Sequence, residues 1–211
     1  MVSPAKYTLG GDRIRHQVYK AEDAADRMRA DYSVVLRFPS GREVSPASFE
    51  QVVQGGRIYI EPHELPEWDK RIRAQVARVI GHGMARECWT KLVVGRGRRG
   101  GGHFKWATRT ATVQRQQTFN SAGNFAGYKL DLTTVTHELA HGLDMVLANN
   151  AGHGPTFRAA HCVTWSFVFG TDALLRKAYE GAGLGVPSVV DLQVSTAYNA
   201  PYLAKLLEAT S

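Results

Sequence analysis

The segment from Asp131 to about Asn149 constrains the fold of this chain most, because it combines a helical pattern with polar side chains at fixed spacing. Its apolar residues recur at helical spacing and form one face: Leu132, Val135, Leu139, Leu143 and Val146. Residues four positions apart on a helix are neighbours, with Cβ atoms about 5–6 Å apart. The imidazoles of His137 and His141 are therefore expected to converge on one point, and Asn149 to Gly152 are expected to end the helix.

These two histidines belong to an HExxH motif, His137-Glu138-Leu139-Ala140-His141. In this pattern the histidines bind one metal ion, and the glutamate reaches a metal-bound water without being a ligand itself. Zinc lowers the pKa of such a water toward about 7, so a carboxylate can take its proton at neutral pH. The motif predicts Zn²⁺ as the cofactor, with His137 and His141 as ligands and Glu138 as the catalytic general base.

A catalytic zinc site usually has three protein ligands and one open position. His153 is the best third ligand, because it follows the expected helix end and a loop can bring it back, with Gly154 and Pro155 behind it. Asp144 lies on the same face as His137 and is either a ligand, a partner that orients a histidine, or a solvated side chain. His161 is either a satisfied core histidine or a ligand or transition-state residue.

The remaining pattern predicts an α+β protein of the zincin-like kind, in which a small mixed sheet packs on the HExxH helix and further helices lie at both ends. Expected helices cover 12–30 (with Asp12 as its cap), a stretch from Leu65, 155–169, 171–181 and 201–209. Expected strands cover 32–46 (two strands around a Pro-Ser-Gly turn), 57–61, 90–94 and 104–115. A polar stretch containing Asn and Gly follows to Tyr128, and residues 182–196 are looser.

We expect one domain over 1–211, with an N-terminal helix at 12–30, a metal-site core at 90–170 and a C-terminal helical extension at 171–211. No run approaches the roughly 20 apolar residues of a membrane span, and the N-terminus has no signal-peptide pattern. Cys88 and Cys162 form no CxxC pattern and are expected to be reduced and buried. These features predict a cytoplasmic protein with no membrane partner.

Basic residues gather around a glycine-rich segment, residues 95–102, in a chain of net charge +7. Arg96, Arg98 and Arg99 lie within it, and Lys105, Trp106 and Arg109 follow. Five glycines in eight residues predict a flexible loop. The loop is either simply solvated or, together with the rest of 95–109, a nucleic-acid contact in which arginines meet phosphates and an aromatic ring stacks on bases.

The segments HELAHGLD and HGPTF resemble the zinc site of SprT/Spartan-like and other small zincin peptidases. More of the chain, over about 12–183, resembles HExxH metallohydrolases of actinobacteria and their phages. The shared features are the element from Val18 to Glu22, a basic strand before the metal helix, HGP-x-F, and a closing helix pair within Phe157–Gly183. This resemblance implies zinc, with His137, His141 and His153 as ligands and Glu138 as base, in a bacterial or phage-infected cell.

The sequence thus predicts a zinc-dependent hydrolase, foremost a metallopeptidase acting on a polypeptide that pairs with the strand near 106–115. Tyr128 and His161 are candidates for assisting the oxyanion. The alternatives are a nucleic-acid-associated protein that uses the basic loop, a structural or virion-associated zinc protein without turnover, and a hydrolase of another class with the same metal centre.

Overall fold

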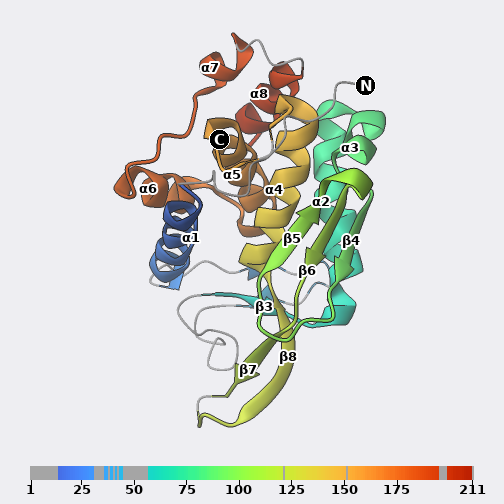
Figure 1. Ribbon diagram of the computed structural model, residues 1–211, viewed down its shortest axis with the longest axis vertical. Coiled ribbons are helices and arrows are strands. Elements are labelled where there is room, and N and C mark those ends of the chain that lie inside the picture. Colours follow the sequence, from blue (N-terminus) through green and yellow to red (C-terminus); the bar gives the residue numbers. More distant parts are fainter. Residues whose placement is uncertain are drawn as a thin grey trace.

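The computed structural model describes residues 14–30, 36–37, 39, 41, 43–44, 57–120, 122–150, 152–194 and 199–210. This part of the chain is α+β, as predicted. Helix α4 (Leu132–Ala148), which carries the HExxH motif, runs through the middle. Helices α1 (Arg15–Ala30) and α6 (Ala173–Gly181) lie on one side of it, and a small sheet with α2 (Leu65–Ile80) and α3 (His82–Cys88) lies on the other (Figure 1).

The helices follow the sequence pattern closely. Helix α5 (Pro155–Phe169) has the predicted bounds, and α8 (Ala200–Glu208) and α6 begin within two residues of theirs. Helix α2 ends at Gly81, whose left-handed φ of 85° favours glycine, and α3 starts at once in a new direction. A short helix α7 (Val189–Gln193) lies in the looser region. The Asp12 cap and most of 32–46 lie outside the described residues.

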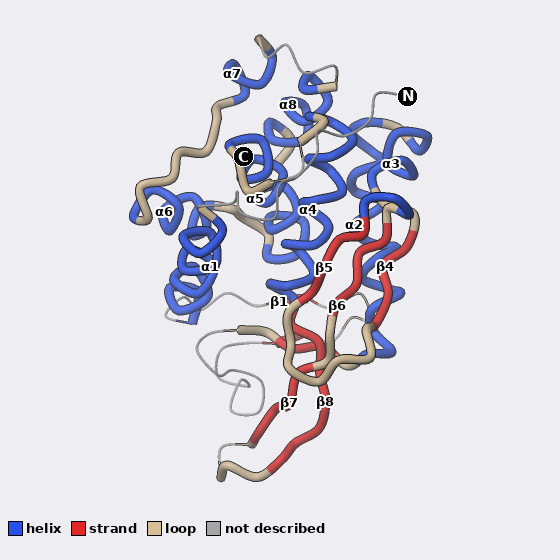
Figure 2. Tube along the Cα trace, viewed as in Figure 1, coloured by secondary structure: helices blue, strands red, loops and turns tan. Residues whose placement is uncertain are grey.

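Two three-stranded sheets pack against α4 (Figure 2). In the first, β4 (Lys91–Val94) pairs in parallel with β6 (Thr110–Val113), and β5 (Gly102–Lys105) pairs antiparallel with the other side of β6. This is the predicted small mixed sheet, and β5 is one of its edges. In the second, β8 (Phe125–Asp131) lies antiparallel between β3 (Tyr59–Ile60) and β7 (Gln116–Phe119). Strands β1 (Leu36–Arg37) and β2 (Glu43–Val44) pair antiparallel in a separate two-stranded sheet.

The strand predicted over 104–115 is wrong as one element. A 3₁₀ turn at Trp106–Thr108 and a left-handed Arg109 (φ 47°) separate β5 from β6, so the chain reverses and the two strands pair with each other. The polar stretch before α4 forms the β7–β8 hairpin, which protrudes from the body of the molecule (Figure 1) and which the sequence pattern did not indicate. Strand β8 then leads directly into α4, so this hairpin fixes where the HExxH helix begins.

The glycine-rich segment after β4 forms a loop, as predicted, and hydrogen bonds join this loop to the end of β6 and the residues after it. The backbone N–H groups of Gly95 and Gly100 donate to the carbonyls of Val113 and Arg115. The N–H of Gly97 donates to the side chain of Gln114, 2.6 Å away. A Cβ on Gly95 or Gly97 would lie within 3 Å of that side chain, so the amide group of Gln114 would have to move if either glycine were replaced.

The ends and sides of α4 explain its position. The Asp131 carboxylate accepts a hydrogen bond from the Thr133 N–H (3.0 Å) and caps the helix, and Asn149 ends it in the left-handed conformation (φ 50°). Gly142 lets α3 approach closely, since a Cβ there would lie 2.5 Å from the carbonyl oxygen of Cys88.

Both Cys88 and Cys162 are buried and form no disulfide. No helix within the described ranges is long and apolar enough to cross a membrane.

Candidate metal centre

Helix α4 presents His137 and His141 on one side, one turn apart, as the spacing predicts. Both side chains are buried, and their ring centroids are 4.9 Å apart. Burial lowers the pKa of His141 well below its usual range, and the neighbouring histidines lower it further. The neutral imidazole that results is the form that binds a metal ion.

His153 reaches the same point from the loop between α4 and α5. The left-handed Asn149 turns the chain back, and Arg158 on α5 holds the loop by donating to the carbonyl of His153 (3.0 Å). The Nε2 atoms of His153 and His137 are 3.1 Å apart, and the ligand nitrogens of all three histidines lie within 4.8 Å of one another. Nitrogens bound to one tetrahedral zinc at about 2.0–2.1 Å would be about 3.3 Å apart. The three histidines therefore fit a metal ion of this kind.

Glu138 lies beside this group and is also buried. Burial raises its pKa to about 7, while His137 lowers it. Its Oε2 atom has no hydrogen-bond partner among the described residues, which is unusual for a buried carboxyl oxygen. The edge strand β5 passes very close, because a Cβ on Gly102 would lie 2.7 Å from the other oxygen, Oε1.

Glu22 of helix α1 completes the back of the centre, and the sequence reasoning about the site missed it. Its Oε1 is 2.5 Å from Nδ1 of His137, and both side chains are buried. Burial raises the pKa of Glu22 well above its usual range, and Arg57 opposes this shift. The signal in the sequence was the element from Val18 to Glu22, whose helical position was clear but whose contact with α4 was not.

His161 lies behind His137 and outside the three-histidine group. It is fully buried, its Nδ1 is 2.7 Å from the hydroxyl of Tyr179, and its Nε2 is 3.3 Å from the hydroxyl of Thr136. Burial lowers its pKa well below the usual range. This environment is that of a satisfied core histidine. Glu22, His137 and His161 nevertheless form a second cluster of metal-ligating side chains.

Asp144 contacts the loop that carries His153. Its Oδ2 accepts a hydrogen bond from the Asn150 side chain (2.9 Å), which also donates to the hydroxyl of Thr156 (3.2 Å). Asp144 is fully buried, so the solvated alternative for this residue is wrong. In this position it ties the start of the His153 loop to α4.

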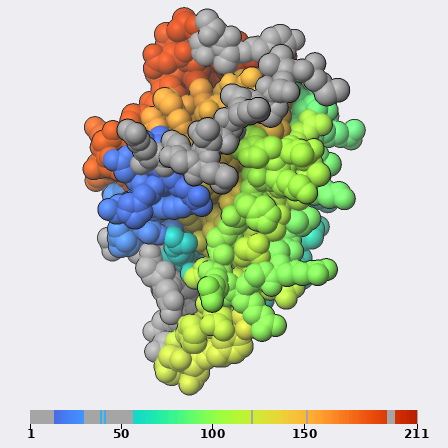
Figure 3. All heavy atoms as spheres, viewed as in Figure 1, coloured from blue at the N-terminus to red at the C-terminus, as the bar shows by residue number. Residues whose placement is uncertain are grey.

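Among the described residues, three aromatic side chains contact the three histidines: Phe157, whose ring centroid lies 5.1, 4.5 and 4.7 Å from those of His137, His141 and His153, Trp106, which lies 5.9 Å from His141, and Tyr19 of α1. The ring centroid of Tyr19 lies 5.3 Å from that of His137 and 5.9 Å from that of His153, and Nε of Arg15 donates to its hydroxyl (3.0 Å). In Figure 3 helix α1, in blue, borders a strip of gold and orange atoms on the face that it shares with the green sheet. Tyr128 instead lies on the hairpin strand β8.

The predicted basic residues do not share one environment. Arg96, Arg98, Arg99 and Lys105 are exposed. Arg109, in contrast, forms an ion pair with Glu87 next to β4. The loop's arginines lie beside the β7–β8 hairpin, since Arg99 bridges to Gln116 at the start of β7.

The hairpin adds an exposed aromatic cluster. Phe119 and Phe125 are 39% and 55% exposed and contact each other edge to face, with centroids 6.3 Å apart. Phe125 also contacts Tyr128 (5.2 Å), over whose ring the guanidinium of Arg98 lies at 5.3 Å. We call Phe119, Phe125, Tyr128 and Arg98 the hairpin cluster. A polar sequence around two phenylalanines gave little sign of it.

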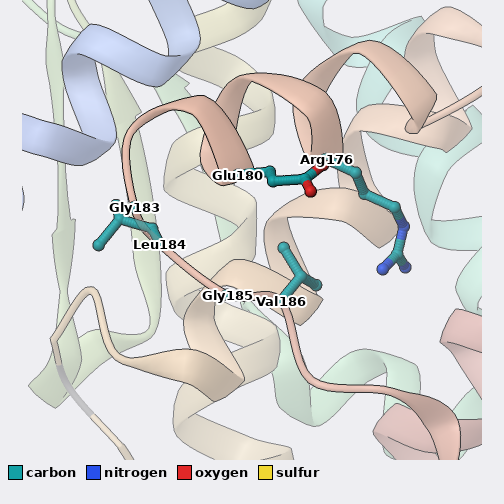
Figure 4. A pocket seen from close by; sticks show the side chains of 6 residues that line it. All are labelled: Arg176, Glu180, Gly183, Leu184, Gly185 and Val186. Carbon is teal, nitrogen blue, oxygen red and sulfur yellow. The ribbon is translucent and has the colours of Figure 1, made fainter.

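A surface pocket of about 440 Å³ lies beside α6 (Figure 4). Arg176 and Glu180 line it from the helix, and residues 183–186 line it from the following turn. It contains none of the histidines, but Arg158 connects the two places, because it also donates to the carbonyl of Gly185 (2.6 Å).

No protein-family model, no curated protein and no solved structure matches this chain. The metal centre therefore rests on the HExxH motif and on the geometry of the buried histidines.

Proposed function

We propose that this protein is a zinc-dependent hydrolase, and specifically a metallopeptidase. The observation that carries the proposal is the convergence of His137, His141 and His153, beside a Glu138 oxygen that has no hydrogen-bond partner within the described ranges. A set of three imidazoles is the ligand set of catalytic rather than structural zinc. When bound, zinc would polarise a carbonyl group and acidify a water molecule.

Glu138 serves as the general base in this proposal. Its pKa of about 7 lets it accept a proton from the attacking water and return that proton to the leaving nitrogen. The burial that raises this pKa also keeps bulk water away from Oε2. Tyr19 contacts the same group and is a better-placed oxyanion donor than Tyr128, because its ring lies against those of His137 and His153.

The edge strand β5 favours a peptide substrate. β5 lies at the end of the β4–β6–β5 sheet, and its Gly102 touches Glu138. An extended peptide could pair with the open edge of this strand and place a peptide bond next to Glu138. Strand β6, which covers part of the segment expected to bind substrate, has β4 and β5 on its two sides and cannot take this role.

The test compares the wild type with Glu138→Gln and a control, Glu67→Gln, at an exposed position on α2. Zinc content is measured by elemental analysis, and cleavage of fluorescent casein and a mixed peptide library is followed by fluorescence and mass spectrometry. Glu138→Gln should keep one zinc per chain and lose at least about 100-fold in hydrolysis. Full activity in this variant would contradict the mechanism, and absence of zinc from the wild type would contradict the metal centre.

A second candidate function is binding of single-stranded nucleic acid, and the hairpin cluster favours it. Exposed aromatic rings offer stacking surfaces for bases, worth about 1–3 kcal/mol each. Arg96, Arg98 and Arg99 are exposed, as is Arg115, to whose carbonyl Gly100 of the same loop donates, and these side chains can contact phosphates. This surface and the metal centre are compatible in one protein.

Fluorescence anisotropy with a labelled oligodeoxynucleotide, measured over a range of salt concentrations, tests this function. The triple variant Arg96→Ala/Arg98→Ala/Arg99→Ala should bind more weakly and show a smaller salt dependence. A matched control removes three exposed cations elsewhere, at Arg27, Lys70 and Lys177. Equal weakening in both triple variants would show a net-charge effect and contradict a defined interface.

A further inference from the structure

We propose that Glu22 of helix α1 is the positioning residue of His137, so that the N-terminal helix is part of the metal centre. This inference rests on the proposed metal site. It assigns a role to a carboxylate that lies 115 positions away in the sequence from the histidine it contacts, with 2.5 Å between Oε1 and Nδ1.

The contact selects one tautomer of His137. In the metal-loaded protein the cation favours the ionised form of Glu22, so a hydrogen on Nδ1 is donated to this carboxylate, and the lone pair on Nε2 is then available to the metal ion. Nε2 is the atom that lies 3.1 Å from Nε2 of His153. Nδ1 of His137 therefore makes the hydrogen bond to Glu22, and Nε2 is the atom that would bind the metal ion.

The competing interpretation is a second metal ion held by Glu22, His137 and His161. The hydrogen bonds of His161 argue against it. The Thr136 hydroxyl donates to the carbonyl of Thr133 (2.8 Å), so it accepts from Nε2–H of His161, and the Tyr179 hydroxyl donates to Nδ1. Both ring nitrogens of His161 are thus engaged by the protein, and this cluster forms a hydrogen-bonded layer behind the three histidines.

Helix α1 does not need Glu22 to dock. Val18, Ala21 and Ala25 of α1 are buried in the core. Farther along the helix, Asp26 accepts hydrogen bonds from Arg29 (2.5 Å) and from the Thr133 hydroxyl of α4 (2.9 Å). A carboxylate buried for packing alone would cost stability, since an apolar side chain of similar size fits such a place better.

Two variants separate positioning from packing. Glu22→Gln keeps a hydrogen-bond acceptor but removes the charge, and Glu22→Leu removes both at similar volume. Outer-shell partners of this kind typically change metal affinity by about 10–100-fold. We expect zinc affinity to fall by about 10-fold in Glu22→Gln and by up to about 100-fold in Glu22→Leu. Glu22→Leu leaves Nδ1 of His137 without its partner, so its metal-free form should unfold at a lower temperature, whereas metal-free Glu22→Gln, which keeps an acceptor, should unfold close to the wild type.

The experiment measures zinc binding to the full chain by competition with a chromogenic chelator, with Glu67→Gln as the control. Nitrogen-15 NMR of the zinc-loaded wild type should show His137 protonated at Nδ1, and this signal should be lost or mixed in Glu22→Leu. If either variant fails to fold, the other variant and the wild-type NMR signal still decide the question.

Three outcomes would overturn the inference. Affinity within twofold of the wild type in both variants would show that Glu22 does not act on the metal through His137. Protonation of His137 at Nε2 in the zinc-loaded wild type would show the opposite tautomer. Two zinc ions per wild-type chain, with one lost in Glu22→Leu, would make Glu22 a ligand. A wild type that binds no zinc would instead refute the proposed function itself.

Discussion

The side-chain carboxyl group of Asp144 is buried beneath the loop that carries His153, and this burial makes the free energy of unfolding depend on pH. One of its oxygens, Oδ2, accepts from Asn150, and the other, Oδ1, has no hydrogen-bond partner in the part of the chain that the structure describes. Burial raises the pKa of Asp144 to about 7 from an ordinary value of 3.8, against the opposing hydrogen bonds from Thr156 and Asn150.

The sign and size of the effect follow from these two pKa values. Below pH 3.8 the carboxyl is protonated in both the folded and the unfolded chain. Between about pH 4 and pH 7 the unfolded chain loses this proton and the folded chain keeps it, so the free energy of unfolding falls by about 1.4 kcal/mol per pH unit. The total loss reaches up to about 4 kcal/mol near pH 7 and is constant above it.

The substitution Asp144→Asn removes the titrating group while keeping its shape. Its advantage over the wild type in free energy of unfolding should therefore grow from about pH 4 to pH 7, by up to about 4 kcal/mol, and then level off. The measurement is urea unfolding of the metal-free proteins, in the presence of a chelator, at several pH values across this range.

Asp191→Asn provides the control, because Asp191 is an exposed capping residue. Hydrogen bonds from Ser188 lower the pKa of Asp191, so its stabilising contribution is lost only as the pH falls below this range. The difference between this variant and the wild type should be flat from pH 5 to pH 8. Parallel curves for Asp144→Asn and the wild type would refute the reasoning for Asp144.

Three further predictions follow from close contacts and from the metal site. Gly142→Ala should lower the free energy of unfolding by about 1–3 kcal/mol in the same urea assay, because its Cβ would lie 2.5 Å from a backbone oxygen. Gly83→Ala is the control, because Gly83 lies on the neighbouring helix with open space around it, and this change should raise the free energy of unfolding by up to about 1 kcal/mol. Gly102→Ala should displace both Glu138 and the β5–β6 pairing, because its Cβ would lie 2.7 Å from the Glu138 side chain and from the carbonyl oxygen of Thr112. It should reduce casein hydrolysis while zinc affinity, measured by chelator competition, stays the same; unchanged hydrolysis would show that β5 tolerates the methyl group. Zinc at about 1,000 times its Kd should stabilise the wild type by about 4 kcal/mol in thermal unfolding, and His153→Ala at the same zinc concentration should lose most of this gain.

The parts of the fold with a strong local pattern could be predicted from the sequence. The helical spacing around the HExxH motif gave α4 within a residue, and Pro155 with Gly170 gave both ends of α5. The convergence of His137 and His141 needed only the geometry of a helix. His153 could be predicted because a loop of this length after a helix end readily turns back.

The contacts between distant segments could not be predicted in this way. The position of Glu22 behind His137 depends on how α1 packs across the molecule, and no local pattern encodes that packing. The hairpin was missed because Gln116 and Gln117 interrupt the apolar alternation of β7, and its stability comes from pairing with β8. The role of Asp144 depended on the left-handed turn at Asn149, which brings Asn150 back over the helix.

The distance in sequence between Glu22 and His137 also matters during synthesis of the protein. A ribosome adds about 5–20 residues per second, so the 115 positions between the two residues correspond to roughly 6–23 seconds. Throughout this interval α4 is missing, and α6, the helix against which α1 packs most extensively, follows later still, so the apolar side of α1 is exposed to water or bound by a chaperone. Because these helices are synthesised at different times, the metal centre assembles late in folding. Zinc uptake by nascent chains would report when α1 and α4 have come together.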